Sequence, residues 1–178
     1  MSSYRASLAL QLALLRARLL PRFALVIVIA SAIAPVLLGD TPEGGGYQAL
    51  AGVGSLLVAE VAGLAAVLGG VAIAGDVSNG ALRSVLLRPV PRGSYLGAVA
   101  TVLVRFTAVL YVAGILAALL AVSWTVGFGD VSHEGYTILT AQEMSTFAWR
   151  LFPLPLAPLL CAPLIALAVS VVIDDQGT

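Results

Sequence analysis

Charged residues are scarce in this sequence, and one basic residue type is missing. Only 10% of the 178 residues are charged, and the nine basic and nine acidic residues give a formal net charge of zero. Without a basic field, nothing in the charge favours a nucleic-acid partner. All nine basic residues are arginine and none is lysine, which indicates a GC-rich bacterial coding bias. No internal repeat or low-complexity linker divides the sequence.

Residues that hold metals or form disulfides are equally rare. The only cysteine, Cys161, lies in an apolar run where neither a disulfide nor a metal site can be built from it. The only histidine, His133, adjoins Glu134, and no second histidine stands at helical spacing to complete a metal site. We therefore expect no metal ion and no cofactor.

Patterns that resemble catalytic motifs are incomplete. Gly127 to Asp130 match the G-x-G-D string of intramembrane aspartyl proteases, but paired-carboxylate catalysis needs a second aspartate at membrane depth, and the sequence has none. Ser55 follows Gly54, but the G-x-S-x-G pattern fails because residue 57 is leucine. We interpret these residues as loop and span-end residues. The prediction is that the protein is not an enzyme and has no catalytic residue.

Apolar residues dominate the composition. The hydrophobic share is 60% and the mean hydropathy is +1.05, more than a soluble domain needs to fill one core. Apolar runs of this length are typical of helices that cross a bilayer. We predict an all-α polytopic transmembrane helical bundle, with residues 1–178 as a single domain. The four predicted spans are 23–38, 49–75, 95–126 and 151–173.

The N-terminal residues 1–22 have a mixed character. Four leucines recur on one helical face and four arginines flank it, a pattern typical of a helix at a membrane surface. The leucines are Leu8, Leu12, Leu15 and Leu19, and the arginines are Arg5, Arg16, Arg18 and Arg22. Pro21 is expected to bend the chain toward the first span. An alternative interpretation is a signal peptide, because Ala30, Ser31 and Ala32 resemble a cleavage site after an apolar core.

Small residues recur at regular spacing in the second span, and prolines are concentrated in the last span. Small side chains recur every four residues along the second span, at Ala62, Ala66, Gly70 and Ala74, and predict a close approach of another helix there. The loop from 128 to 150 is predicted to contain a short amphipathic helix around Thr140–Phe147. Four prolines predict an irregular or kinked outer half of the last span; they are Pro153, Pro155, Pro158 and Pro163.

Two ionisable residues interrupt the apolar spans, Glu60 in the second and Arg105 in the third. A charge at this depth costs about 2.5 to 3.5 kcal/mol on insertion scales, so each must face protein, water or an opposite charge. One interpretation is that the two residues pair. The other is that Arg105 extends to the cytoplasmic interface and Glu60 faces a polar cavity.

The arginines also predict the orientation. Four precede the first span and three fill the loop 76–94, whereas the first outer loop has none and the second has only Arg150. Because positive residues concentrate on the cytoplasmic side, the N-terminus and this loop are expected in the cytoplasm.

The loop 76–94 is expected to form one short helix between two breaks. Asp76, Asn79 and Gly80 are expected to end the preceding helix. Ser78 is a candidate N-cap for the short helix, whose apolar face comprises Leu82, Val85 and Leu86. Pro89 and Pro91 end it, and Ser94 is expected to cap the following span.

This segment resembles the cytoplasmic loop of ABC-2 type transporter permeases. The resemblance rests on the run from Ala74 through Asp76, on Asn79 to Arg83, and on Leu86 to Arg92. In that family a pattern like A-G-E-x-x-x-G-T-L-R-x-x-L-x-R-P-v-x-R follows the second span. The interfacial N-terminal helix and the order of spans also fit. The usual six spans exceed the four predicted here, so the chain is expected to be an incomplete or shortened relative.

The resemblance implies a membrane subunit of an ABC exporter in a bacterial inner membrane. It implies a separate ABC ATPase subunit as partner, because this sequence lacks the G-x-x-x-x-G-K-[ST] loop, and it implies a second permease subunit. The residues expected to couple to the ATPase are Asp76, Gly80, Leu82, Arg83, Leu86, Arg88, Pro89 and Arg92. The alternatives are that the arginines only set topology and bind anionic lipid, and that the chain is a non-transporting scaffold or accessory subunit.

Overall fold

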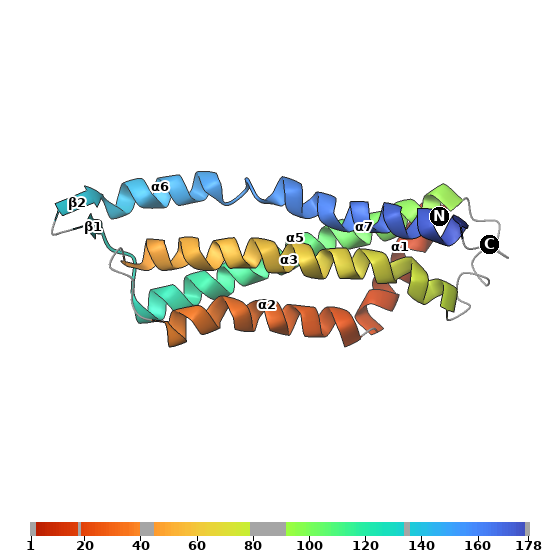
Figure 1. Cartoon of the computed structure of the whole chain (residues 1–178), viewed down its shortest axis with the longest axis horizontal. Coiled ribbons are helices and arrows are strands. Elements are labelled where there is room, and N and C mark those ends of the chain that lie inside the picture. Colours follow the sequence, from red (N-terminus) through yellow and green to blue (C-terminus); the bar gives the residue numbers. More distant parts are fainter. Residues whose placement is uncertain (1–2, 18, 40–44, 79–91, 134–135, 177–178) are drawn as a thin grey trace. The chain divides into compact units, whose positions relative to one another are not determined.

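The protein is an all-α helical bundle, as the sequence predicts. The computed structural model describes residues 3–17, 19–39, 45–78, 92–133 and 136–176. The helices are α1 (Ser3–Ala17), α2 (Leu19–Leu38), α3 (Gly45–Ser78), α5 (Arg92–Thr125), α6 (Ala141–Leu151) and α7 (Leu156–Gln176), and β1 (Val131–His133) pairs with β2 (Tyr136–Leu139) (Figure 1).

Four stretches are long and apolar enough to cross a membrane, which indicates a multi-pass membrane protein. They are Leu19–Leu38, Gly45–Val71, Gly93–Thr125 and Ala141–Val172. The last range includes the amphipathic helix α6, but α7 alone has 21 residues and, at 1.5 Å per residue, extends about 31 Å. Helix α7 therefore matches a hydrocarbon core of about 30 Å by itself.

The chain folds into two compact units. The long helices α3 and α5 are each divided between them, with one half of each helix in either unit. The first unit comprises Met1–Ala24, Ala62–Ala108 and Pro158–Thr178, and the second comprises Leu25–Val61 and Val109–Ala157. Each unit has its own buried apolar residues, so each is described separately.

The core of the first unit joins three helices. Leu68 of α3, Leu167 of α7 and three residues of α5, Tyr95, Val99 and Leu103, form one buried apolar cluster. Gly69 lies beside it, where a Cβ would come within 2.5 Å of the Pro163 carbonyl oxygen. This backbone approach of α3 and α7 requires glycine, because any side chain would overlap the partner helix.

The close approach of α3 and α7 falls one residue away from the predicted position. Gly70 was expected to lie on the small-residue face with Ala62 and Ala66, but nothing lies within 4 Å of a Cβ built at Gly70. The buried residues of this part of α3 are instead Ala65, Leu68 and Gly69. The predicted face is wrong because small residues fill two adjacent faces of α3, and a four-residue period does not say which of them is covered.

The core of the second unit joins α2, α3 and α5. Val28, Leu57 and Leu110 are fully buried there. Gly114 of α5 lies against Val28 and Leu57, because a Cβ at this glycine would come within 2.9 Å of a methyl group of each. The absence of a side chain at residue 114 therefore lets three helices meet.

The N-terminal helix packs on protein through a polar face. Where the exposure of its side chains is described, Ser7 and Gln11 are buried, whereas Leu8, Leu12 and Leu15 of the predicted apolar face are only partly buried. The Tyr4 hydroxyl lies 2.9 Å from Thr101 Oγ1 on α5. Because the Thr101 hydroxyl already donates to the Gly97 carbonyl at 2.7 Å, Tyr4 is the donor in this pair. Pro21 lies in the first turn of α2, which begins at Leu19, two residues before it.

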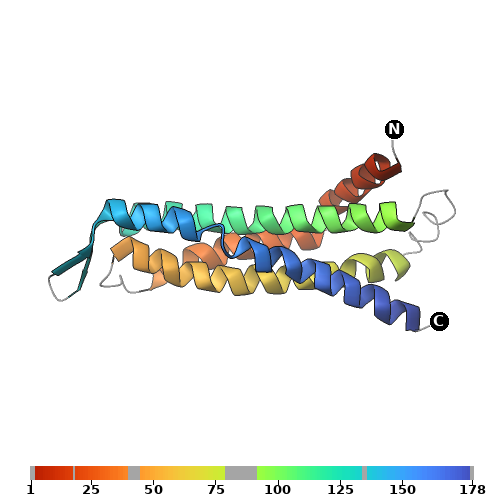
Figure 2. The same ribbon diagram turned by 90° about the horizontal axis from the view of Figure 1, so that it is seen from above.

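The segment after α5 contains a hairpin that the sequence analysis did not predict. Gly127 ends α5 with a φ of +73°, and its amide donates to the Val122 carbonyl at 2.9 Å. Strands β1 and β2 then pair antiparallel and lead directly into α6, as Figures 1 and 2 show. The signal was the β-branched and aromatic composition of Tyr136–Leu139.

The prolines of the last predicted span separate α6 from α7. The Leu154 amide donates to the Leu151 carbonyl, and the Leu156 amide donates to the Pro153 carbonyl. Both bonds join residues three apart in sequence, so this stretch forms turns in place of a continuous helix. Helix α7 begins only at Leu156 and contains Pro163 in its interior. The predicted irregular stretch is thus confirmed, at residues 152–155.

Candidate functional site

The predicted coupling loop joins α3 to α5. Residues 79–91 lie outside the described residues, so the predictions for Gly80, Leu82, Arg83, Leu86, Arg88 and Pro89 stay predictions. Asp76 lies in the last turn of α3, and Arg92 is the first residue of α5. The described part of α3 extends to Ser78, between Asp76 and Asn79, two of the residues that were predicted to end this helix. The predicted N-cap at Ser94 is wrong, because α5 already includes this residue.

The two helices that flank the loop share one core in the first unit. Tyr95 and Val99 of α5 pack in one cluster with Leu68 of α3, and Leu96 and Ala100 pack against the same cluster. Close-packed side chains resist independent movement of the elements that carry them. Within the first unit, α3 and α5 are therefore held together by a shared apolar cluster.

Glu60 has a partner that the sequence analysis missed. The Ser31 hydroxyl on α2 donates to a carboxylate oxygen of Glu60 on α3, and it also lies 3.1 Å from the Val28 carbonyl oxygen. Both residues belong to the second unit and are partly buried. The signal in the sequence is the lone hydroxyl of Ser31 in an apolar span, which itself indicates a polar partner.

Arg105 lies on the half of α5 that belongs to the first unit, where its side chain is exposed. Glu60 belongs to the second unit. The pairing of Glu60 with Arg105 therefore stays a prediction.

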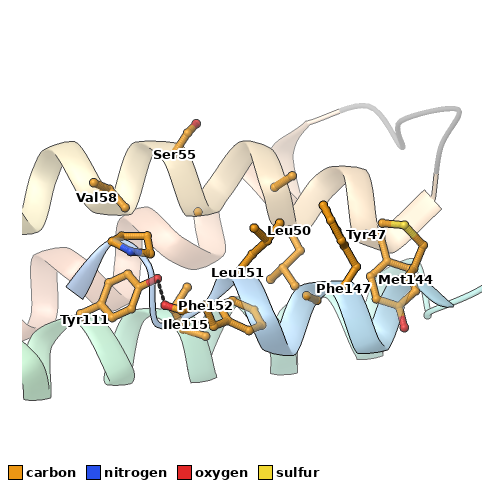
Figure 3. A pocket seen from close by; sticks show the side chains of 14 residues that line it. Tyr47, Leu50, Ser55, Val58, Tyr111, Ile115, Met144, Phe147, Leu151 and Phe152 are labelled. Carbon is orange, nitrogen blue, oxygen red and sulfur yellow. Dashed lines mark hydrogen bonds between the residues drawn. The ribbon is translucent and has the colours of Figure 1, made fainter. Parts of the chain in front are cut away.

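A cavity of about 270 Å³ lies within the second unit, between α3, α5 and α6 (Figure 3). Its wall on α6 is the apolar face of that helix, and the opposite walls come from the N-terminal half of α3 and from α5. The lining residues are Tyr47, Leu50, Ala51, Gly54, Ser55, Val58, Tyr111, Ile115, Met144, Phe147, Ala148, Leu151, Phe152 and Pro155.

Every hydroxyl group among these lining residues already donates a hydrogen bond. Tyr47 donates to the Ala141 carbonyl at 3.1 Å and Tyr111 donates to the Phe152 carbonyl at 3.1 Å. Ser55 donates to the Gly52 carbonyl at 2.8 Å, and its hydroxyl points away from α6 in Figure 3. The cavity therefore offers no free side-chain donor, and its chemistry is that of a hydrocarbon site.

Helix α6 is positioned by its N-terminal contacts. Thr140 is the N-cap and forms a capping box with Glu143: its hydroxyl accepts from the Glu143 amide, and its own amide donates to the Glu143 carboxylate at 3.0 Å. The Asp130 carboxylate accepts the Ala141 amide at 2.7 Å. The predicted amphipathic helix is thus confirmed, and it extends beyond Phe147 to Leu151.

Asp130 and Gly127 have structural roles in this arrangement. Asp130 binds the first amide of α6, and Gly127 ends α5 in a conformation with positive φ. These are the residues of the G-x-G-D string, and their contacts belong to the ends of two helices. Among the described residues, no group of three or more His, Cys, Asp or Glu side chains is placed to hold a metal ion.

Comparison with known proteins does not place the chain in a family. No protein-family model, no curated protein and no solved structure matches it. The likeness to ABC-2 permeases therefore rests on the motif between Ala74 and Arg92 and on the arrangement of spans.

Proposed function

We propose that the protein is a membrane-spanning permease subunit of an ABC-2 type exporter, in a bacterial inner membrane with its N-terminus in the cytoplasm. The observation that carries this proposal is the order of residues from Ala74 to Arg92, directly between two apolar spans. The described structure supports it with four candidate spans and with two long helices, α3 and α5, that meet this segment from either side.

The proposed mechanism uses the loop to move two spans. A separate ATPase subunit binds and hydrolyses ATP, and it contacts the apolar residues Leu82 and Leu86 and the guanidinium groups of Arg83 and Arg88. Its closure displaces the loop, and the shared cluster of Leu68 with the α5 residues carries the movement into both spans. Two permease subunits together then open a path for a hydrophobic or amphipathic substrate.

The test is co-purification from membranes of the native host. Tagged chain is extracted in mild detergent, and bound proteins are identified by mass spectrometry. We expect an ATPase with a G-x-x-x-x-G-K-[ST] motif among them. The double variant Arg83→Glu, Arg88→Glu is expected to lose this ATPase by on the order of tenfold or more, since charged contacts at an interface each contribute on this scale.

A matched control reverses the same number of charges outside the loop. The double variant Arg16→Glu, Arg18→Glu should retain the ATPase. Topology is checked in each variant by labelling a single cysteine placed at Ser2 in a Cys161→Ala background. Wild-type chain that binds no ATPase, or loop variants that bind it fully, would contradict the proposal and favour a non-transporting scaffold.

A further inference from the structure

The cavity beneath α6 has the properties of a lipid-binding site. We propose that it binds one acyl chain of a bilayer phospholipid, held between the apolar face of α6 and the N-terminal half of α3. This proposal does not depend on the proposed transport function, because it rests on the second unit and on the multi-pass membrane character alone.

The volume fits a segment of hydrocarbon chain. The cavity measures about 270 Å³. An apolar cavity of about 150 Å³ binds benzene, and pockets for drug-sized ligands begin at about 300 Å³. The space is therefore sufficient for several methylene groups and too small for a bulky amphipathic molecule.

The polarity of the walls selects an apolar ligand. The Tyr47 and Tyr111 hydroxyls each donate to a backbone carbonyl, and the Ser55 hydroxyl does the same within α3. A ligand with hydrogen-bond acceptors, such as a carboxylate, would lose its hydrogen bonds to water on entry and find no free side-chain donor among these groups. A hydrocarbon chain has no hydrogen bonds to lose, and it makes van der Waals contacts with the apolar walls.

The cavity is continuous with the surface that faces lipid. Ala51 and Ser55, which line it, are themselves exposed. Leu56 follows on α3 with 58% of its surface exposed, and Val112 and Leu116 of α5 flank the lining residue Ile115 with 51% and 54% exposed. Exposed apolar side chains on a membrane span contact acyl chains, so a chain of the surrounding bilayer reaches the opening without crossing a polar surface.

Helix α6 has the composition of a helix at the lipid head groups. Its cavity-lining residues Met144, Phe147, Ala148 and Leu151 recur at helical spacing and form one apolar face. Trp149 is 75% exposed, as is typical of aromatic residues at a membrane interface. Arg150 is exposed and forms no ion pair within the described part of the chain, which leaves its guanidinium open to a phosphate group. These features favour a phospholipid over a ligand without a charged head group.

The experiment fills the cavity with a side chain. Gly54 lines it, and a Cβ there meets nothing within 4 Å, so Gly54→Leu should fold normally and occupy the space. Gly52→Leu is the matched control, because Gly52 lies on the same helix with equally open surroundings but does not line the cavity. The full chain is reconstituted in vesicles of phosphatidylcholine and phosphatidylglycerol that contain a phosphatidylcholine with a diazirine in one acyl chain. After illumination, adducts are mapped by mass spectrometry, and circular dichroism verifies the helix content of each variant.

We expect adducts enriched on the cavity residues of α6 in the wild-type chain and in Gly52→Leu. Gly54→Leu should reduce them by on the order of tenfold, because the leucine side chain occupies the space in which the acyl chain would lie. Adducts on exposed span residues such as Leu116 should not change. Equal labelling of the cavity in both variants would overturn the proposal. A wild-type chain with no lipid adducts on the cavity residues of α6 would also overturn it.

Discussion

The contact between Gly69 and Pro163 gives the sharpest prediction about stability. Replacing Gly69 by alanine places a methyl group 2.5 Å from the Pro163 carbonyl oxygen and 3.3 Å from the Ala166 methyl group. Real Cβ atoms do not approach backbone oxygen this closely, so α3 and α7 must separate. Such overpacking of a close-packed contact costs about 1 to 3 kcal/mol.

Gly70→Ala is the matched control for this substitution. Gly70 is the next residue of the same helix, and a Cβ there meets nothing within 4 Å. Both variants gain the same intrinsic helix propensity, which is at most about 1 kcal/mol for alanine over glycine. The difference between the two variants therefore isolates the helix contact, and Gly69→Ala should be less stable than Gly70→Ala by about 1 to 3 kcal/mol.

The assay is equilibrium unfolding of the purified chain in mixed micelles with increasing dodecyl sulfate, followed by far-ultraviolet circular dichroism. A result in which Gly69→Ala is as stable as Gly70→Ala would refute the close approach of α3 and α7. If only Gly70→Ala were destabilised, the face of α3 that carries Ala62 and Ala66 would be the face that packs against another helix.

Two further substitutions test contacts of the second unit. Ser31→Ala removes the hydrogen bond to Glu60. It should lower the free energy of unfolding by about 0.6 kcal/mol, and by no more than about 1.7 kcal/mol, the range measured for hydrogen bonds between membrane helices. Ser55→Ala is the control, because its bond lies within its own helix; it should lower the free energy of unfolding less, and equal losses would count against the bond between α2 and α3. Thr140→Ala removes the N-cap of α6 and should destabilise the first turn of this helix by about 1 kcal/mol. This loss corresponds to roughly fivefold faster hydrogen exchange of the first amides of α6. Thr146→Ala, in the middle of α6, should leave the exchange of those amides unchanged.

The sequence by itself determined the fold class and most of the elements. Long apolar runs with few charges can satisfy their backbone groups in a bilayer only as helices, so the four spans and their order follow from composition and length. Local chemistry also located α6, because the Thr140 and Glu143 side chains cap a helix through contacts over three residues. The prolines fixed the break before α7 for the same local reason.

Only the tertiary structure decided which faces and which partners meet. The small residues of α3 occupy two neighbouring faces, and the position of α7 selects Gly69 over Gly70. Ser31 and Glu60 are separated in sequence, and the packing of α2 on α3 brings them together. The cavity beneath α6 likewise needs three helices to form its walls. Such contacts depend on how helices are rotated about their axes, and an apolar sequence encodes that rotation weakly because every face of a membrane helix is hydrophobic.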